Sequence, residues 1–107
     1  MLKLSAVLLT LVIFCPAPAM AEAPDAGRQA QLLYLLKHDC GSCHGMTRKG
    51  GLGPALLPER LRDFPPEFLV TTILDGRTGT PMPPWRGELS EADARWLVEA
   101  LNRGEGL

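Results

Sequence analysis

The sequence is poor in aromatic residues and has no excess of charge of either sign. It contains two Trp, one Tyr and three Phe, and its 11 Lys and Arg stand against 12 Asp and Glu, for a formal net charge of −1. A nucleic-acid-binding domain usually carries a clear basic excess, so the charge balance argues against that class of protein. A disordered chain would hold fewer apolar residues than the 46% found here. The 107 residues therefore predict one globular domain.

That domain has little material for a core. Besides the few aromatics, the chain carries 11 Gly and 10 Pro, which favour turns over packed elements. Domains of this size usually need a disulfide, a metal or a covalent cofactor to hold them together. We therefore expect one of these.

An uncharged apolar segment near the N-terminus has the layout of a secretory signal peptide. Lys3 provides the positive start, residues 4–14 are the apolar stretch, and small residues stand before a cleavage site after Ala21. We expect residues 1–21 to be a cleaved signal peptide and residues 22–107 to form the exported domain, in the periplasm of a bacterium. The alternative is a retained membrane anchor, because the uncharged stretch barely reaches the length of a span. Cleavage would leave no stable membrane association.

The sequence of residues 22–107 predicts short helices joined by loops. Apolar spacing and start and stop signals place helices over residues 28–38, 58–62, 67–74 and 91–103. Residues 23–27 are expected to fray, and the Gly- and Pro-rich segments 41–53 and 77–87 are expected to be loops. Ser90 followed by Asp93 predicts a capping box. No alternating pattern predicts a strand, so the expected fold class is all-α.

The motif C-x-x-C-H at residues 40–44 carries the chemistry. It is the attachment signature of a c-type haem. Two thiols at this spacing can add to the two vinyl groups on one edge of the porphyrin, and the next residue can supply an imidazole to the iron. Cys40 and Cys43 are therefore predicted to hold one covalent haem c, with His44 as an axial ligand.

Three other interpretations of the two cysteines are weaker. A thioredoxin-type redox pair is expected in a βαβ setting, which the sequence does not predict. A zinc site needs four well-placed ligands, and the candidates His38, Cys40, Cys43 and His44 are crowded within one short segment. A disulfide between Cys40 and Cys43 would close too small a loop to stabilise the chain much. Haem attachment explains the adjacent histidine and the small core together.

The second axial ligand is argued by elimination. His38 and Met46 are close to His44 in the chain and so are held near its own side of the ring. Met82 is far enough away to reach the other face, and its flanking prolines stiffen the loop that carries it. The alternative is that Met82 only packs in the core. The iron would then be open to small gases, as in a haem-based sensor or enzyme.

These features together resemble the class I cytochrome c family. They are a first helix, C-x-x-C-H, Gly-Pro-x-Leu at residues 53–56, a Met-Pro loop and a closing helix. The resemblance implies a small helical fold around one haem, with the Pro54 carbonyl accepting from the His44 ring, Leu56 packed on the haem and Trp85 near a propionate. One departure is Leu36, which stands where the family usually has an aromatic.

The segments around residues 39–45 and 79–85 most resemble the small NirC-type cytochromes encoded beside the dihaem nitrite reductase of denitrifying bacteria. This resemblance implies a monomeric periplasmic electron-transfer protein whose partner is a redox protein, with that nitrite reductase as the candidate. An alternative is an accessory redox factor for maturation of the d-type haem, and a second is a haem-based ligand sensor. No acid–base pair or nucleophile motif indicates catalysis by the polypeptide, so we expect no enzyme.

Charges and glycines in the loops leave two questions open. Arg48, Lys49, Arg77 and Arg86 could form a basic rim that steers an acidic partner to the haem edge, or they are ordinary solvated charges. The glycines of residues 50–53 could let the backbone pass close to the porphyrin, or could form a flexible turn.

Overall fold

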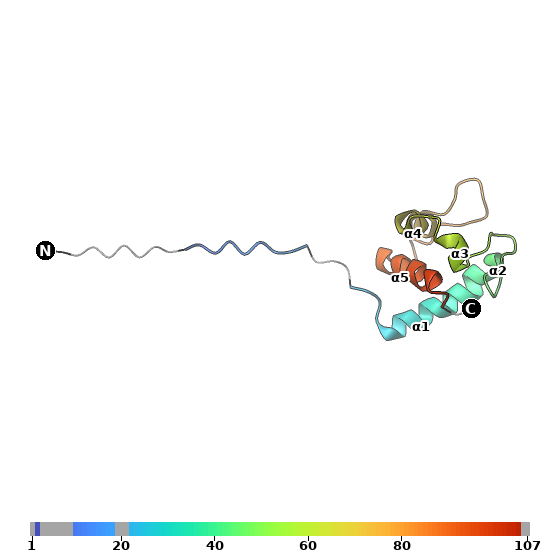
Figure 1. The fold of residues 1–107 in the computed structure, drawn as a ribbon, viewed down its shortest axis with the longest axis horizontal. Coiled ribbons are helices and arrows are strands. Elements are labelled where there is room, and N and C mark those ends of the chain that lie inside the picture. Colours follow the sequence, from blue (N-terminus) through green and yellow to red (C-terminus); the bar gives the residue numbers. More distant parts are fainter. Residues whose placement is uncertain (1, 3–9, 19–21, 106–107) are drawn as a thin grey trace.

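The computed structural model describes residue 2, residues 10–18 and residues 22–105. Within these ranges the chain forms helices and no strand (Figure 1), which confirms the all-α fold class. The elements are α1 (Ala26–Leu35), the π-helix η1 (Leu36–Cys40), α2 (Gly41–His44), α3 (Pro58–Leu61), α4 (Pro66–Asp75) and α5 (Glu91–Asn102).

The first three elements form one continuous helical stretch, which corrects the sequence prediction at both ends. The helix begins at Ala26, inside the segment expected to fray, because the Asp25 side chain caps it by accepting from the Arg28 N–H at 2.8 Å. It also runs through residues 41–44, which were expected to be loop. The N–H of Gly41 donates to the Leu36 carbonyl, so helical hydrogen bonding continues past this glycine. Gly45, with φ of 89°, ends the stretch.

The other helices follow their predicted signals closely. Helix α3 begins with Pro58 at a tolerated position, and α4 ends before Gly76, which has φ of 68°. Helix α5 begins after Ser90, whose side chain accepts from the Asp93 N–H while the Asp93 carboxylate accepts from the Ser90 N–H. The expected capping box is therefore present.

The core lies around α5, which packs between α1 and α4 (Figure 1). The predicted inner face of α5 is buried, as is Leu36 from η1. An ion pair of 2.9 Å between Arg28 and Asp93 links the start of α1 to the start of α5. The core is built from the buried apolar residues Leu32, Leu36, Leu61, Val70, Leu74, Leu89, Ala94, Trp96, Leu97, Val98, Ala100 and Leu101.

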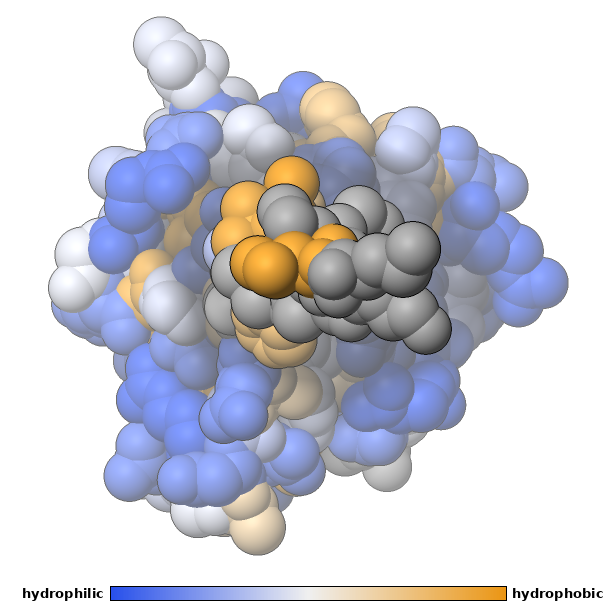
Figure 2. Space-filling model, turned by 90° about the vertical axis from the view of Figure 1, so that its left-hand side faces the viewer, coloured by the Kyte–Doolittle hydropathy of each residue, from blue (hydrophilic) through white to orange (hydrophobic). Residues whose placement is uncertain are grey.

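Residues 10–18 extend away from the helical body and form no helix (Figure 1). Their apolar side chains are exposed and stand in front of a largely hydrophilic face (Figure 2). Lys3 and the expected cleavage site at residues 19–21 lie outside the described residues, so the division at residue 21 stays a prediction. In the described part of the chain, no helix has both the length and the apolar character needed to cross a membrane.

Candidate haem site

One cavity of about 660 Å³ opens among the helices, and it brings together the residues that the sequence predicted to hold the haem. Its volume is in the range of about 300–1,000 Å³ that is usual for cofactor sites. Most of its other lining side chains are apolar. The predicted site residues that line it are Cys40, Cys43, His44, Pro54, Leu56, Met82 and Trp85.

The helical stretch presents the two cysteines and the histidine. Cys40 ends η1, and Cys43 and His44 lie in α2 one turn further on. Burial, with a smaller contribution from Asp39, raises the pKa of the Cys40 thiol to about 11. A catalytic or redox-active cysteine needs a lowered pKa, so this thiol is unlike those of thioredoxin-type sites.

The His44 ring is oriented by the backbone that follows it. Its Nδ1 donates to the Pro54 carbonyl oxygen at 2.7 Å, the hydrogen bond implied by the cytochrome c resemblance. Gly53 packs against the same ring, since a Cβ there would lie 2.8 Å from both Nδ1 and Cε1. With Nδ1 occupied, Nε2 remains as the ring nitrogen available to a metal. The segment 53–54 therefore fixes both the tautomer and the rotation of the imidazole.

The loop after His44 is closed by backbone hydrogen bonds. The Gly50 N–H donates to the His44 carbonyl at 2.9 Å, and the Gly53 N–H donates to the Cys43 carbonyl at 2.8 Å. A Cβ at Gly51 would lie 2.8 Å from that Cys43 oxygen. Gly51 and Gly53 are thus required by close approach to Cys43 and His44, a contact that neither sequence interpretation named, whereas Gly50 is favoured by its φ of 109°.

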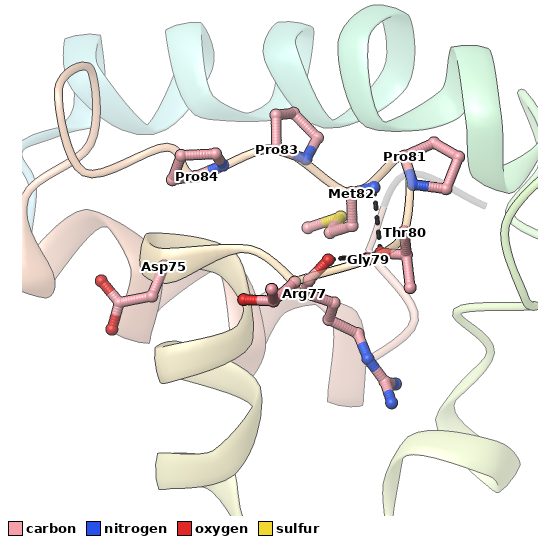
Figure 3. A pocket seen from close by; sticks show the side chains of 9 residues that line it. Asp75, Arg77, Gly79, Thr80, Pro81, Met82, Pro83 and Pro84 are labelled. Atoms are coloured by element: carbon pink, nitrogen blue, oxygen red, sulfur yellow. Dashed lines mark hydrogen bonds between the residues drawn. The ribbon is translucent and has the colours of Figure 1, made fainter.

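Met82 is carried by a loop that is held together by its own hydrogen bonds (Figure 3). The Thr80 hydroxyl donates to the Arg77 carbonyl at 2.7 Å and accepts from the Met82 N–H at 3.3 Å. The Arg77 N–H donates to the Met82 carbonyl at 3.2 Å, which closes the loop. Gly76 lies against the backbone of this loop, where a Cβ would come within 2.7 Å of the Met82 carbonyl oxygen. Hydrogen bonds and prolines together restrict where the thioether can go.

The competing axial candidates lie elsewhere. His38 and Met46 are exposed and do not line the cavity. The His38 ring instead contacts the exposed ring of Tyr34, with 4.3 Å between centroids. Leu36, at the position where the family usually has an aromatic, is buried in the core and also lines the cavity. The elimination made from the sequence therefore agrees with the geometry.

Two aromatic residues of the cavity wall were missed as site residues. Phe64 and Phe68 line the cavity and stack on each other, with ring centroids 5.6 Å apart and an angle of 18° between the rings. Phe68 lies in the helix that the sequence predicted over residues 67–74. The signal available was a pair of aromatics four residues apart, on either side of Pro65-Pro66.

The charged residues do not form the rim considered from the sequence. Arg48 is buried, with 1% of its surface exposed. Arg86 pairs with Asp75 at 2.8 Å, and Arg77 lines the cavity. Of the four residues, Lys49 is exposed and has no ion pair in the described part of the chain. A four-residue basic rim is therefore wrong, because one member is inside the fold and another is already paired.

The donor set fits a haem better than a bare metal ion. Across residues 10–18 and 22–105, no three or more His, Cys, Asp and Glu side chains gather closely enough to hold a metal ion. What the cavity offers is one oriented imidazole, one thioether and two thiols on a mainly apolar wall. Iron in a porphyrin needs only one or two protein ligands, and its ring needs apolar surroundings. These residues meet both needs.

Known proteins are similar to this chain over most of its length. A family model described as cytochrome c oxidase, cbb3-type, subunit III matches residues 26–99. Cytochrome c55X of Pseudomonas aeruginosa is 62% identical over 98 residues, which cover 91% of this chain and 82% of that protein. The solved structure of the c-type cytochrome NirC is 65% identical with a TM-score of 0.75, covering 77% of this chain and 96% of that one.

A larger protein contains a similar unit. The structure of dihydro-heme d1 dehydrogenase NirN in complex with DHE is 42% identical with a TM-score of 0.60, over 64% of this chain and 15% of that one. The family model and the relatives span the helices that build the cavity. The chain therefore belongs to the c-type cytochromes, as a NirC-type cytochrome c with covalently bound haem c.

Proposed function

We propose that this chain is a periplasmic monohaem electron carrier whose haem is attached at Cys40 and Cys43 and whose iron is held by His44 and Met82. The observation that carries this proposal is the single cavity lined by both thiols, the oriented imidazole and the thioether. When bound, haem supplies a one-electron couple between ferric and ferrous iron. Two protein ligands would leave no coordination position for a substrate, which favours a carrier over an enzyme or a sensor.

Each part of the chain contributes to fast, reversible electron transfer. The Pro54 carbonyl holds the imidazole in one orientation, and the Thr80 hydroxyl holds the loop that presents the thioether. Leu56, Phe64 and Phe68 provide apolar wall that excludes water, while Trp85 lies at the same cavity with its backbone N–H donating to the Ile73 carbonyl. A rigid, dry site changes its structure little when the charge of the iron changes, so the reorganisation energy of electron transfer is small.

The proposed partner belongs to nitrite reduction, with the dihaem nitrite reductase as electron acceptor. The support is the likeness to NirC and cytochrome c55X, together with the resemblance of segments 39–45 and 79–85 to the cytochromes encoded beside that reductase. The same placement implies export, with residues 1–21 as the signal that is removed. A carrier of this size would act as a monomer that meets its partner transiently.

A second candidate function is accessory electron transfer during maturation of the d-type haem. A specific observation favours it, namely the 42% identity between this chain and a unit of a protein called dihydro-heme d1 dehydrogenase. A dehydrogenation releases two electrons, and a monohaem protein takes up one at a time. Two molecules of this chain, or one molecule used twice, would therefore accept the electrons of one turnover.

The site is tested on the exported protein by mass spectrometry and optical spectra with and without carbon monoxide. We expect the mass of one haem on the chain, its loss in Cys40→Ala with Cys43→Ala, and a methionine-ligated ferric spectrum. The reduced spectrum should ignore carbon monoxide. A spectrum that shifts with carbon monoxide would contradict the carrier and favour a ligand sensor.

The partner is tested by stopped-flow mixing at two ionic strengths. We expect the reduced protein to be oxidised rapidly by purified dihaem nitrite reductase, with second-order kinetics. The matched experiment mixes oxidised protein with the dehydrogenase and dihydro-heme d1. If the dehydrogenase reduces this protein but the nitrite reductase does not oxidise it, the maturation role replaces the main proposal.

A further inference from the structure

Arg48 is the most unusual charged residue of the fold. Its side chain is 99% buried, and its Nη2 has no hydrogen-bond partner among the residues described. Its backbone also has φ of 57°, a left-handed conformation that residues other than glycine rarely adopt. Buried cations are usually paired, because leaving water without a partner is costly. The chain thus maintains a charge that does not serve its stability.

The surroundings of Arg48 place that charge beside the haem-attachment segment. The Arg48 N–H donates to the carbonyl of Gly45, the residue after His44, at 2.8 Å. Its carbonyl accepts from the N–H of Leu56, which lines the cavity, at 2.9 Å. Burial lowers the pKa of the Arg48 guanidinium from its usual value, and the guanidinium is near enough to Cys40 to lower the pKa of that thiol against the larger rise caused by burial. Arg48 itself does not line the cavity.

We propose that Arg48 is a buried, uncompensated positive charge that raises the reduction potential of the haem attached at Cys40 and Cys43. Reduction lowers the positive charge of the iron by one, so a nearby buried cation stabilises the ferrous state. Water and salt screen such a charge poorly because it lies inside the fold. Arg48 thus acts at a distance: its charge shifts the reduction potential of the haem without contacting the iron. The inference rests on the proposed haem attachment.

The experiment compares Arg48→Met with Arg48→Lys and with Lys49→Met in the full holoprotein. Methionine has a similar length without charge, lysine keeps the charge, and Lys49 is the adjacent exposed cation. Midpoint potentials are measured by optical redox titration at low and high salt, and thermal stability by circular dichroism. We expect Arg48→Met to lower the potential at both salt concentrations without losing stability, because an unpaired buried charge has been replaced by an apolar side chain.

The controls separate charge from structure. Arg48→Lys should keep the wild-type potential, and Lys49→Met should give a smaller shift that disappears at high salt. An unchanged potential in Arg48→Met would overturn the proposal. So would a shift that Arg48→Lys reproduces, or failure of Arg48→Met to fold and load haem, since that would mean a structural partner for the guanidinium. A wild type lacking the haem mass would instead overturn the attachment on which the inference rests.

Discussion

At the residue scale, the site depends on a few side chains whose neighbours leave them little freedom. The spacing in C-x-x-C-H predicted which residues bear the chemistry, and elimination pointed to Met82 as the distant ligand. The sequence could not predict that Gly53 must lack a side chain to admit the His44 ring, because that contact exists only after the loop has closed. It also could not predict that Arg48 is buried.

Met82→Ala tests the proposed second ligand. Removing the thioether should abolish the charge-transfer band of methionine-ligated ferric haem, lower the reduction potential and create affinity for carbon monoxide. Optical spectra and a redox titration measure all three. Met46→Ala is the matched control, because Met46 is half-exposed and lies outside the cavity, so it should leave the spectrum unchanged. An unaltered band in Met82→Ala would show that another residue ligates the iron.

Thr80→Val tests the hydrogen bonds that hold the Met82 loop. Valine keeps the shape but loses the hydroxyl that joins the Arg77 carbonyl to the Met82 N–H. Loss of about 1 kcal/mol should raise the fraction of iron without methionine roughly fivefold, which speeds carbon monoxide or imidazole binding by the same factor. Thr80→Ser keeps the hydroxyl and should behave as the wild type. Equal ligand-binding rates in both variants would remove Thr80 from this role.

At the scale of helices, local signals predicted starts and stops well and failed where a neighbouring element intervened. Ser90 and Gly76 acted as expected, because capping depends on adjacent residues. The loop predicted over residues 41–44 was wrong: Gly41 and the glycines after His44 favour a loop locally, but these residues form α2. Hydrogen bonding from the preceding π-helix carried the helix through to His44. Such π-helical turns are rare and are often found at functional sites.

Asp93→Asn tests the junction of α1 and α5. The Arg28 guanidinium, with help from Ser90, holds the pKa of the Asp93 carboxyl below its usual range. We expect the variant to lose about 1–3 kcal/mol of unfolding free energy at pH 7, since a part-buried ion pair and a cap are both weakened. Glu91→Gln, at an exposed pair on the same helix, is the control and should change little.

The same junction predicts a pH dependence. Because the pKa of Asp93 is lower in the folded than in the unfolded chain, its stabilisation is complete above the unfolded value of about 3.9 and is lost as the pH falls toward the folded value. Urea unfolding of wild type and Asp93→Asn should therefore give free energies that converge in acid. A difference that stays constant from pH 7 down to pH 2 would contradict the ionic origin of the effect.

At the scale of the whole molecule, the chain divides into an apolar N-terminal segment and a helical body. The described part of the first segment, residues 10–18, makes no helix and leaves its large apolar side chains exposed. In the body, α1 meets the central helix α5 through the Arg28–Asp93 pair, and the cavity lies between α5, α4 and the attachment segment. That residues 1–21 are a signal removed on export stays a prediction.

Export gives a prediction for the mature N-terminus. Cleavage after Ala21 should leave Glu22 as the first residue of the periplasmic protein, and N-terminal sequencing or intact mass measures this directly. Ala19→Phe replaces the small residue at the −3 position and should leave the precursor uncleaved. Wild-type protein that keeps Met1 and stays in the membrane fraction would instead indicate the retained anchor.

The sequence by itself determined the all-α class and the haem-attachment motif, because helix periodicity, capping and the spacing in C-x-x-C-H are properties of neighbouring residues. The distant methionine as second ligand stays a prediction. Only the tertiary structure decided which charges face solvent and which apolar side chains line the cavity. Arg48 lies inside the fold, and Phe64 and Phe68 belong to the cavity wall. Burial depends on how distant elements pack together, and no local pattern contains that information.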